Sequence, residues 1–311
     1  MKRIIPCVFI TLALILAGSF LPLFGVIGIM LCPLPLCILG CSEGHKRMSI
    51  AELMIEATLF LAVSPSMAVY FLVGCAPLSA MIFTLSRKEF KDVKKYSGAA
   101  SLLICTGASI FFKLLLLVLF WVFTKRNILL PDMSQMTAIM SQLYADQPEL
   151  QEAVIRALAL IPYLMPTLLI LYCTAEAFMN YSLCHKLTRK LFPKVENYPP
   201  ELPEFKLWRF PASLIIVSVI SLLIGYFIDS DAWFEGSVFI MNLQVIVNVF
   251  MFVEGLSILF WIMDGFKFRK ASKVIACVVI AIPFFWPWLI VIGMCDIVLN
   301  LRERIKLGKQ S

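Results

Sequence analysis

Long stretches without a single charged side chain are the feature that most constrains this chain. Lys, Arg, Asp and Glu are absent from residues 4–42, 57–86, 157–175, 210–228, 236–253 and 274–295. Each stretch is about as long as the ~20 residues that cross a bilayer as a helix, or longer. Hydrophobic residues make up 61% of the chain and charged ones 15%, whereas soluble domains have about 45–50% and about 25%. We therefore exclude a soluble fold and predict an all-α, polytopic transmembrane helix bundle.

The charges between these stretches are sorted by sign. The basic segments are 1–3, 41–49, 86–96, 184–209, 264–273 and 302–309, which hold 23 of the 27 Lys and Arg residues and eight acidic residues. The connectors 125–156 and 229–236 hold three basic and seven acidic residues. Because Lys- and Arg-rich loops stay in the cytoplasm, we expect a multi-pass protein of the bacterial plasma membrane with a cytoplasmic N-terminus. The net charge of +7 then reflects topology within the lipid bilayer, and we expect no nucleic-acid partner.

Length and proline positions divide the apolar stretches into helices. Residues 4–40 and 50–85 are too long for one span, and both ends of each are basic, so we predict turns at Pro22–Gly25 and Ser64–Ser66. The segment after the first turn is expected to be irregular at Pro33 and Pro35. In total we expect one membrane domain, 1–311, with about 8–9 hydrophobic helices, some of them short or re-entrant.

The predicted order of segments follows from the same boundaries. It comprises N-terminal helices over 4–124, an outer connector over 125–152, a span over 153–183 kinked at Pro162 and Pro166, a basic, proline-rich cytoplasmic loop over 184–207, C-terminal helices over 208–299 and a basic tail over 300–311. The apolar run 274–299 fits either a tilted span or a re-entrant hairpin around Pro283–Pro287. These two alternatives place the C-terminus on opposite sides.

The outer connector has the pattern of an amphipathic helix. Asp132 can cap a helix over 133–145, and its apolar side chains share one stripe: Met133, Met136, Met140, Leu143 and Tyr144. Asp146–Glu149 is typical of a second helix start. We expect the first helix to lie on the outer membrane surface, either as a lid over an outward-facing cavity or as a plain surface helix.

Polar side chains at membrane depth are costly, and they usually face the bundle interior or a cavity. Residue counts from the charged loops place Lys113, Asn242, Gln244 and Asn248 in the outer half or near the middle of the membrane. A cation with amide groups suits a small anionic or heteroaromatic ligand, so these four residues are our candidate ligand site. The alternative is that Lys113 extends to the outer interface and the amides hold helices together.

A second set of polar residues is acidic. Glu56, Glu176 and Glu254 each lie ~10 Å from the predicted inner boundary, and Asp296 can join them in an inner acidic layer. Three interpretations stay open: pairing with Arg or Lys from the inner loops, protonation in an apolar environment, or proton relay.

Catalytic and metal motifs are absent from the sequence. No nucleotide-binding, Ser-hydrolase or zinc-protease pattern occurs, and the spacing of Cys32, Cys37 and Cys41 fits no usual zinc site. We therefore predict a protein that is not an enzyme and that has no cofactor and no metal.

Several motifs resemble those of the YybS-like bacterial membrane proteins. They are Leu202-Pro-Glu-Phe-Lys-Leu-Trp-Arg-Phe-Pro211, Leu21-Pro22-Leu23-Phe24, Pro33-Leu34-Pro35, Asn242 with Glu254-Gly255-Leu256-Ser257, and Gly293-x2-Asp296-x3-Asn300-Leu301-Arg302. The resemblance covers nearly the whole chain. The group is distantly similar to the substrate-binding S components of energy-coupling-factor transporters, which dock a transmembrane coupling subunit through Ala-x3-Ala on the first helix. Ala13 and Ala17 match that pattern, which implies a partner-helix contact there.

Two functions are compatible with these observations. The first is a membrane-embedded, small-molecule-binding transporter subunit that resembles an S component and relies on a coupling subunit and ATPases for energy. The alternative is a non-transporting scaffold of the cell envelope that docks cytoplasmic partners through its basic loops.

Overall fold

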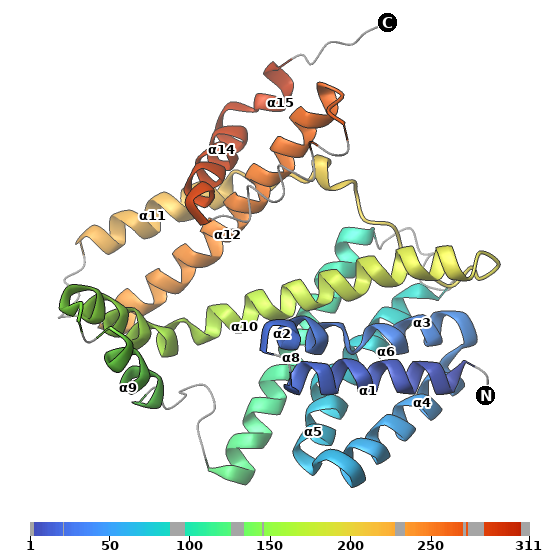
Figure 1. Cartoon of the computed structure of the whole chain (residues 1–311). Helices are drawn as coiled ribbons and strands as arrows, with labels where there is room; N and C mark the ends of the chain where they lie inside the picture. Colours follow the sequence, from blue (N-terminus) through green and yellow to red (C-terminus); the bar gives the residue numbers. More distant parts are fainter. Residues whose placement is uncertain are drawn as a thin grey trace, which may run out of the picture. The chain divides into compact units, whose positions relative to one another are not determined.

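The structure is a computed structural model that describes residues 3–20, 22–87, 97–125, 134–144, 146–227, 234–269, 272 and 283–305. Within these ranges all regular structure is helical, as the sequence predicts (Figure 1). The chain forms two compact units. The first unit is Met1–Pro131 with Leu168–Leu202, and the second unit is Asp132–Thr167 with Pro203–Ser311. The single membrane domain stays a prediction.

The first unit begins with short helices. They are α1 (Ile4–Phe20), α2 (Pro22–Leu31), α3 (Leu34–Glu43), α4 (His45–Thr58), α5 (Pro65–Val69) and α6 (Ala76–Ser86). The π-helical turns Leu59–Val63 and Tyr70–Cys75 precede α5 and α6. The predicted break at Ser64–Ser66 is confirmed, because Ser64 is extended and its Oγ accepts a hydrogen bond from the Met67 amide at 3.2 Å. The predicted turn at Pro22–Gly25 is wrong, because these four residues form the first turn of α2, where proline is tolerated. Helix α1 ends at Phe20, and Leu21 lies outside the described residues.

Two long helices complete the first unit. They are α8 (Gly98–Thr124), which falls within the N-terminal helices predicted over 4–124, and the C-terminal part of α10 (Pro148–Leu191). One core contains side chains from α1, α3, α4 and α5, and the largest buried ones include Leu36, Met48, Ile55 and Phe71. A second core holds Tyr181 and Cys184 of α10 against residues of α3, α6 and α8.

The second unit contains α9 (Ser134–Leu143), the N-terminal part of α10, α11 (Ser213–Phe227), α12 (Phe234–Gly265), α14 (Trp286–Leu299) and α15 (Leu301–Arg304). Helices α12 and α14 approach each other backbone to backbone. A Cβ built on Gly255 would collide with the Leu289 carbonyl oxygen, and one built on Gly293 would collide with that of Met251. Only glycine permits this crossing, which is typical of membrane helix pairs.

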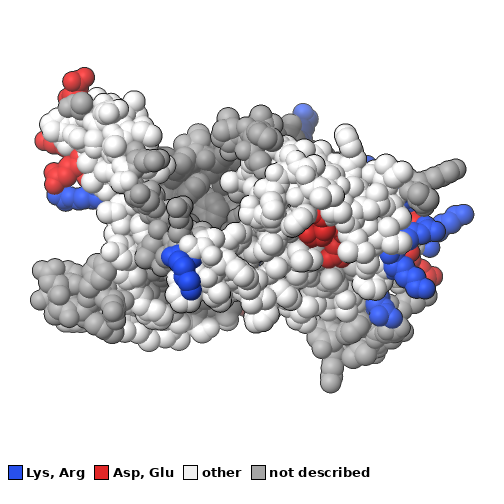
Figure 2. Space-filling view, turned by 90° about the horizontal axis from the view of Figure 1, so that it is seen from below, with Lys and Arg blue, Asp and Glu red and all other residues white. Residues whose placement is uncertain are grey.

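Several of the described helices are long enough to cross a membrane. Five segments are long and apolar enough to cross a bilayer: Gly25–Glu43, Pro65–Ser86, Gly98–Thr124, Pro148–Leu191 and Gly236–Gly265; shorter apolar helices are Ile4–Gly18, Ser213–Phe227 and Trp286–Leu299. Large apolar side chains stay exposed on α8, with 72% of Leu103 and 81% of Phe123 accessible. Figure 2 shows broad surface areas without Lys, Arg, Asp or Glu. Such a surface fits lipid rather than water.

The predicted boundary of the basic loop at residue 184 is wrong. Helix α10 continues to Leu191, because Tyr181, Cys184 and Thr188 are buried at helical spacing and extend its inner face. The basic residues Arg189 and Lys190 stand in the last turn, where they favourably meet the negative end of the helix dipole. The extended, proline-rich segment therefore begins at Phe192.

Other predictions about the connectors have mixed outcomes. The helix expected over 133–145 is present as α9, and Pro148 starts α10 as expected. Asp132, Met133, residues 274–282 and residues 306–311 lie outside the described residues. The choice between a tilted span and a re-entrant hairpin for 274–299 therefore stays open.

Candidate functional site

Lys113 lies on the buried face of α8. That face recurs every three or four residues through Ser101, Cys105, Ser109, Lys113 and Leu116. The rest of the helix is apolar and largely exposed, so the periodicity places the Lys113 side chain inside the protein, with only 4% of the residue accessible. The side chain therefore does not extend to the interface.

The ammonium group of Lys113 has three hydrogen-bond acceptors. Its Nζ lies 2.5 Å from Oε2 of Glu176 on α10, 3.1 Å from the Gly74 carbonyl oxygen and 3.3 Å from Ser109 Oγ. Ser109 donates to the same Glu176 oxygen at 2.6 Å. The Tyr172 ring lies beneath the cation at 5.4 Å. Charge-assisted hydrogen bonds of this kind offset part of the cost of burying both ions.

The Gly74 carbonyl belongs to a π-helical turn over Tyr70–Cys75. A π turn departs from the α-helical bonding pattern, and such turns concentrate at functional sites. Glycine also lets α8 come close, because a Cβ on Gly74 would lie 3.3 Å from Cδ2 of Leu116. Backbone irregularity and a small residue together bring a carbonyl dipole to the Lys113 ammonium.

Two acceptor atoms beside this pair have no donor among the described residues. They are Oε1 of Glu176 and Oδ1 of Asn180, and both residues are fully buried. Asn180 stands one helical turn after Glu176, and its Nδ2 donates to the Met30 and Glu176 carbonyl oxygens at 2.7 and 2.8 Å. A buried acceptor without a donor costs roughly 1–3 kcal/mol. The two atoms are therefore places where a donor from a bound molecule gains free energy.

We name the group formed by Gly74, Ser109, Lys113, Glu176 and Asn180 the Lys113–Glu176 centre. Its charges cancel, and its open hydrogen-bonding capacity is for donors. It contains a cation, a carboxylate and an amide within the first unit.

A second buried ionic group in the second unit is centred on Arg302. Its Nε lies 2.8 Å from Oδ2 of Asp296, and its Nη2 lies 3.0 Å from Oε1 of Glu254. Arg302 also donates to Ser257 Oγ at 3.1 Å and to the Lys206 carbonyl at 2.7 Å. The remaining Glu254 oxygen accepts from the Phe210 amide at 2.9 Å. Both oxygens of Glu254 are therefore satisfied, and this group ties α12, α14 and the tail together.

The predicted amide residues also form bonds within the second unit. Asn242 accepts from Thr167 Oγ1 at 2.6 Å and donates to the Tyr163 carbonyl at 2.8 Å. That carbonyl lies in the turn before Pro166, whose ring disturbs the helix ladder. Gln244 accepts from Ser221 at 2.8 Å and donates to Asn248 at 3.1 Å. These bonds join α12 to α10 and α11, as the helix-locking alternative predicts.

The model of the family described as "Predicted membrane protein (DUF2232)" matches residues 9–297. The chain belongs to this family. The DUF2232 match contains the whole Lys113–Glu176 centre. "Uncharacterized protein YybS" from Bacillus subtilis (strain 168) is 24% identical over 302 residues, covering 92% of this chain and 92% of the relative. The YybS-like resemblance is thereby confirmed. No solved structure matches the chain.

In this DUF2232 protein the outer polar residues and the inner acidic residues do not stay in the two sets that the sequence analysis predicted. Glu176, placed with the inner acids by its sequence distance from residue 184, binds Lys113 instead. The reason is the length of α10: Glu176 lies 15 residues before its last residue, Leu191, and Lys113 lies 15 residues after the first residue of α8, Gly98. Each is thus about 22 Å from its helix end at 1.5 Å per residue. The sequence analysis placed Glu176 and Lys113 in different layers, and the structure brings them together.

The other three predicted acidic residues lie in two different parts of the structure. Glu254 and Asp296 are brought together by Arg302, which confirms the pairing alternative for these two acids. Glu56 is half-buried on α4, and its Oε1 accepts no hydrogen bond from the described residues. The sequence analysis missed Ser109, Asn180 and Arg302. Ser109 and Asn180 stand four residues from Lys113 and Glu176, so helical spacing was the signal that could have found them.

Proposed function

We propose that this protein is the small-molecule-binding component of a membrane transport system without an ATPase of its own, and that the Lys113–Glu176 centre binds the transported molecule. One observation carries the proposal: Glu176 is fully buried and hydrogen-bonded through Oε2, while its Oε1 and the neighbouring Asn180 Oδ1 have no donor among the described residues. A purely structural ion pair gains from satisfying every oxygen, as Glu254 does beside Arg302.

The open acceptors define the ligand class. Glu176 already compensates the Lys113 charge, so the centre does not favour the anionic molecule that the sequence suggested. It favours a compact molecule with N–H or O–H donors, such as an amine, an amide or a hydroxylated heterocycle, because both open atoms are acceptors.

Position and backbone support transport over a purely structural role. Charged groups at membrane depth mark ligand and ion pathways by default. Transporter sites lie within the membrane beside interrupted helices. The centre lies about 22 Å from the first residue of α8 and from the last residue of α10, beside the π turn Tyr70–Cys75.

Partners and orientation follow the same proposal. Helix α1 buries Val8, Thr11 and Ile15, whereas Ala13 is exposed and Ala17 is half-buried. This small-residue face fits the close approach of a partner helix, here a transmembrane coupling subunit bound to ATPases. We place the protein in the bacterial plasma membrane with its N-terminus in the cytoplasm, because of the charge asymmetry of its connectors.

The proposal is tested by identifying what the protein retains. The full chain is purified in mild detergent, denatured, and its released small molecules are measured by mass spectrometry. We expect a donor-bearing compound in the wild type that is lost in Glu176→Gln and in Lys113→Met/Glu176→Gln, where no unpaired buried charge remains. Gln244→Ala is the matched control and should retain it. Loss in Gln244→Ala with retention in both Glu176 variants would transfer the site to the amide residues and refute the proposal.

The scaffold alternative has one observation in its favour. The proline-rich segment after α10 has a fixed course, because Tyr181 Oη donates to the Pro200 carbonyl at 2.8 Å and His185 Nδ1 lies 2.7 Å from that of Pro199. An ordered, proline-rich segment of this kind is a suitable docking surface. Replacing 192–200 by a flexible Gly/Ser linker should then remove a cytoplasmic partner and leave small-molecule retention unchanged. The transport proposal predicts unchanged retention and no loss of such a partner.

A further inference from the structure

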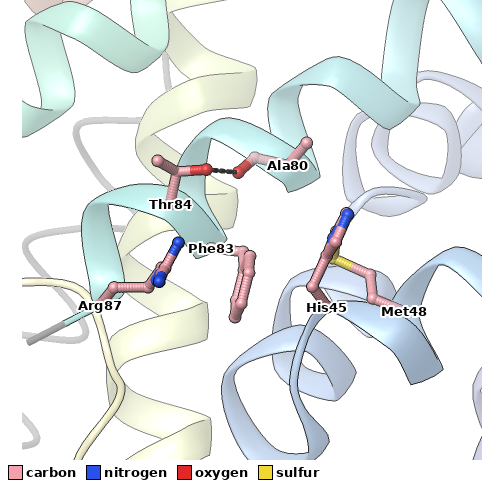
Figure 3. Close-up of a pocket in the computed structure, with 6 residues that line it drawn as sticks. All are labelled: His45, Met48, Ala80, Phe83, Thr84 and Arg87. Atoms are coloured by element: carbon pink, nitrogen blue, oxygen red, sulfur yellow. Dashed lines mark hydrogen bonds between the residues drawn. The ribbon is translucent and has the colours of Figure 1, made fainter.

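The pocket between α4 and α6 of the first unit carries no excess of buried charge. Its volume is about 390 Å³, and it is lined by His45, Met48, Ala80, Phe83, Thr84 and Arg87 (Figure 3). The His45 and Arg87 side chains are exposed, and the Thr84 hydroxyl donates to the Ala80 carbonyl at 2.8 Å. An excess of buried charge is present instead in the second unit, around Arg302.

The Arg302 group, which we define as Arg302, Glu254 and Asp296, places two carboxyl groups against one guanidinium. Glu254 and Asp296 are both 0% exposed, and the Arg302 side chain is 7% exposed. The guanidinium contacts Glu254 at 3.0 Å and Asp296 at 2.8 Å. With both carboxyl groups ionised, the group has one negative charge too many. A buried charge without a counter-ion is strongly disfavoured, and such groups neutralise instead.

The other described basic residues of the adjoining segments do not supply the missing positive charge. Lys206 and Arg209 precede α11 and bind other carboxylates, and Arg304 is exposed on α15. The ion pairs of the first two are Lys206–Glu204 at 2.7 Å, Lys206–Asp264 at 3.1 Å and Arg209–Glu303 at 3.3 Å.

The crossing of α12 and α14 holds the two carboxyl groups together. Glu254 directly precedes Gly255, and Asp296 stands three residues after Gly293. A Cβ on either glycine would lie 2.0 Å from a carbonyl oxygen of the opposite helix, so the helices are in backbone contact here. The two carboxyl groups also interact directly with each other. Repulsion between two carboxylates therefore opposes the close contact of the helices.

The hydrogen bonds leave room for a proton at Asp296. Its Oδ2 accepts from Arg302 Nε at 2.8 Å, whereas its Oδ1 has only the Arg302 amide, at 3.4 Å. Both oxygens of Glu254 accept closer bonds, at 2.9 and 3.0 Å. Asp296 also stands in the last turn of α14, where the negative end of the helix dipole opposes a carboxylate. Two carboxyl groups held close together in this way share one proton.

We propose that Glu254 and Asp296 form a buried proton-binding site, which holds one proton at neutral pH while Arg302 balances the remaining negative charge. The titration belongs to the pair of carboxyl groups rather than to either residue. Release of the proton leaves two carboxylates on one guanidinium and weakens the contact of α14 with α12. The site is independent of the transport proposal, because it lies in the second unit and shares no residue with the Lys113–Glu176 centre.

Infrared difference spectroscopy of the full chain in nanodiscs tests the site. At neutral pH we expect the carbonyl band of a protonated carboxyl group in the wild type and its loss in Asp296→Asn. In that variant an amide N–H takes the place of the proton, and Arg302 is balanced by Glu254 alone. Glu303→Gln is the matched control, because it removes an exposed carboxylate from the same segment, and the band should persist.

Thermal unfolding against pH is the second measurement. The native pair holds a proton that carboxyl groups of the unfolded chain lose above about pH 5, so the native state is favoured less as the pH rises. The Tm of the wild type should therefore fall between about pH 6 and about pH 9 relative to that of Asp296→Asn. Glu303→Gln should follow the wild type.

Three results would overturn the proton-binding site. A wild-type spectrum without any protonated carboxyl band at neutral pH would show that both groups are ionised, and this result needs no variant. An unchanged band in Asp296→Asn would assign the proton to another carboxyl group. Parallel curves of Tm against pH for the wild type and Asp296→Asn would show that no proton is bound at the pair.

Discussion

The ammonium of Lys113 and the carboxylate of Glu176, 63 positions apart in the sequence, lie 2.5 Å from each other in the buried interior of the first unit. Arg156 and Glu152 form an ion pair with the same 2.5 Å separation, but their side chains are 76% and 66% exposed. The two ion pairs thus have the same N–O distance and differ in burial. The exposed Arg156–Glu152 pair is therefore a suitable control for the buried Lys113–Glu176 pair.

Lys113→Ala should destabilise the protein strongly. Removal of one partner leaves a buried carboxylate without a counter-ion, which costs roughly 3–5 kcal/mol. Arg156→Ala breaks an exposed pair and should cost about 0–1 kcal/mol. Thermal unfolding of both variants in the same detergent measures the difference, and equal shifts in Tm would show that the Lys113 pair is not desolvated.

Removing both charges should restore most of this stability. Lys113→Met/Glu176→Gln replaces the ion pair with groups of similar size, and such replacements are often neutral. We expect its Tm to lie closer to the wild type than that of either single variant, although the donor-bearing compound is lost. A double variant less stable than both single ones would contradict the pairing. The variant therefore separates stability from binding.

The crossing of α12 and α14 should depend on its glycines. Gly255→Ala forces a methyl group against the Leu289 carbonyl, and overpacking of this kind costs about 1–3 kcal/mol. Gly107→Ala is the control, because open space surrounds Gly107 on α8 and alanine favours a helix by roughly 0.5–1 kcal/mol. Tm should fall for the first and stay or rise for the second. A tolerated Gly255→Ala would mean that the helices are farther apart.

Arg302 should hold the C-terminal segment in place. Arg302→Lys cannot contact Asp296, Glu254 and the Lys206 carbonyl together, because lysine lacks the planar fork of arginine. Hydrogen exchange in 286–304 should therefore increase. Arg209→Lys changes an exposed arginine that contacts Glu303 at 3.3 Å, and exchange there should change little. The same increase in both variants would contradict a special role for the buried arginine.

The local parts of this fold could be predicted from the sequence, and the distant contacts could not. The break at Ser64–Ser66 and the start of α10 at Pro148 follow from capping and proline chemistry, which act within a few residues. The end of α10 was missed because Lys186, Arg189 and Lys190 suggested a loop, although basic residues also favour the last turn of a helix.

The sequence identified two residues of the candidate site but not their pairing, for a related reason. Lys113 and Glu176 stood out as charges in apolar sequence, but their pairing depends on where two helices end, and the error at residue 184 shifted the depth of Glu176. The π turn at Tyr70–Cys75 and its carbonyl contact to Lys113 have no local signature in the sequence. Asn180 was available from its spacing to Glu176, four residues away on the same face.

The membrane orientation is open to a separate test. With a membrane-impermeant maleimide on intact cells, a cysteine in place of Asp146 should be labelled from outside, and one in place of Lys46 only after lysis. The native cysteines of the described ranges are buried, apart from the half-buried Cys295, so wild-type labelling should be low. The reverse pattern would invert the topology inferred from the charges.

An experimental density map of the full chain in lipid nanodiscs tests the central claim most directly. The account predicts a non-protein feature larger than one water within about 2.7–3.2 Å of Glu176 Oε1, and its absence from the map of Lys113→Met/Glu176→Gln. A protein side chain donating to that oxygen, or close apolar packing around it, would show that the buried pair is structural and binds nothing.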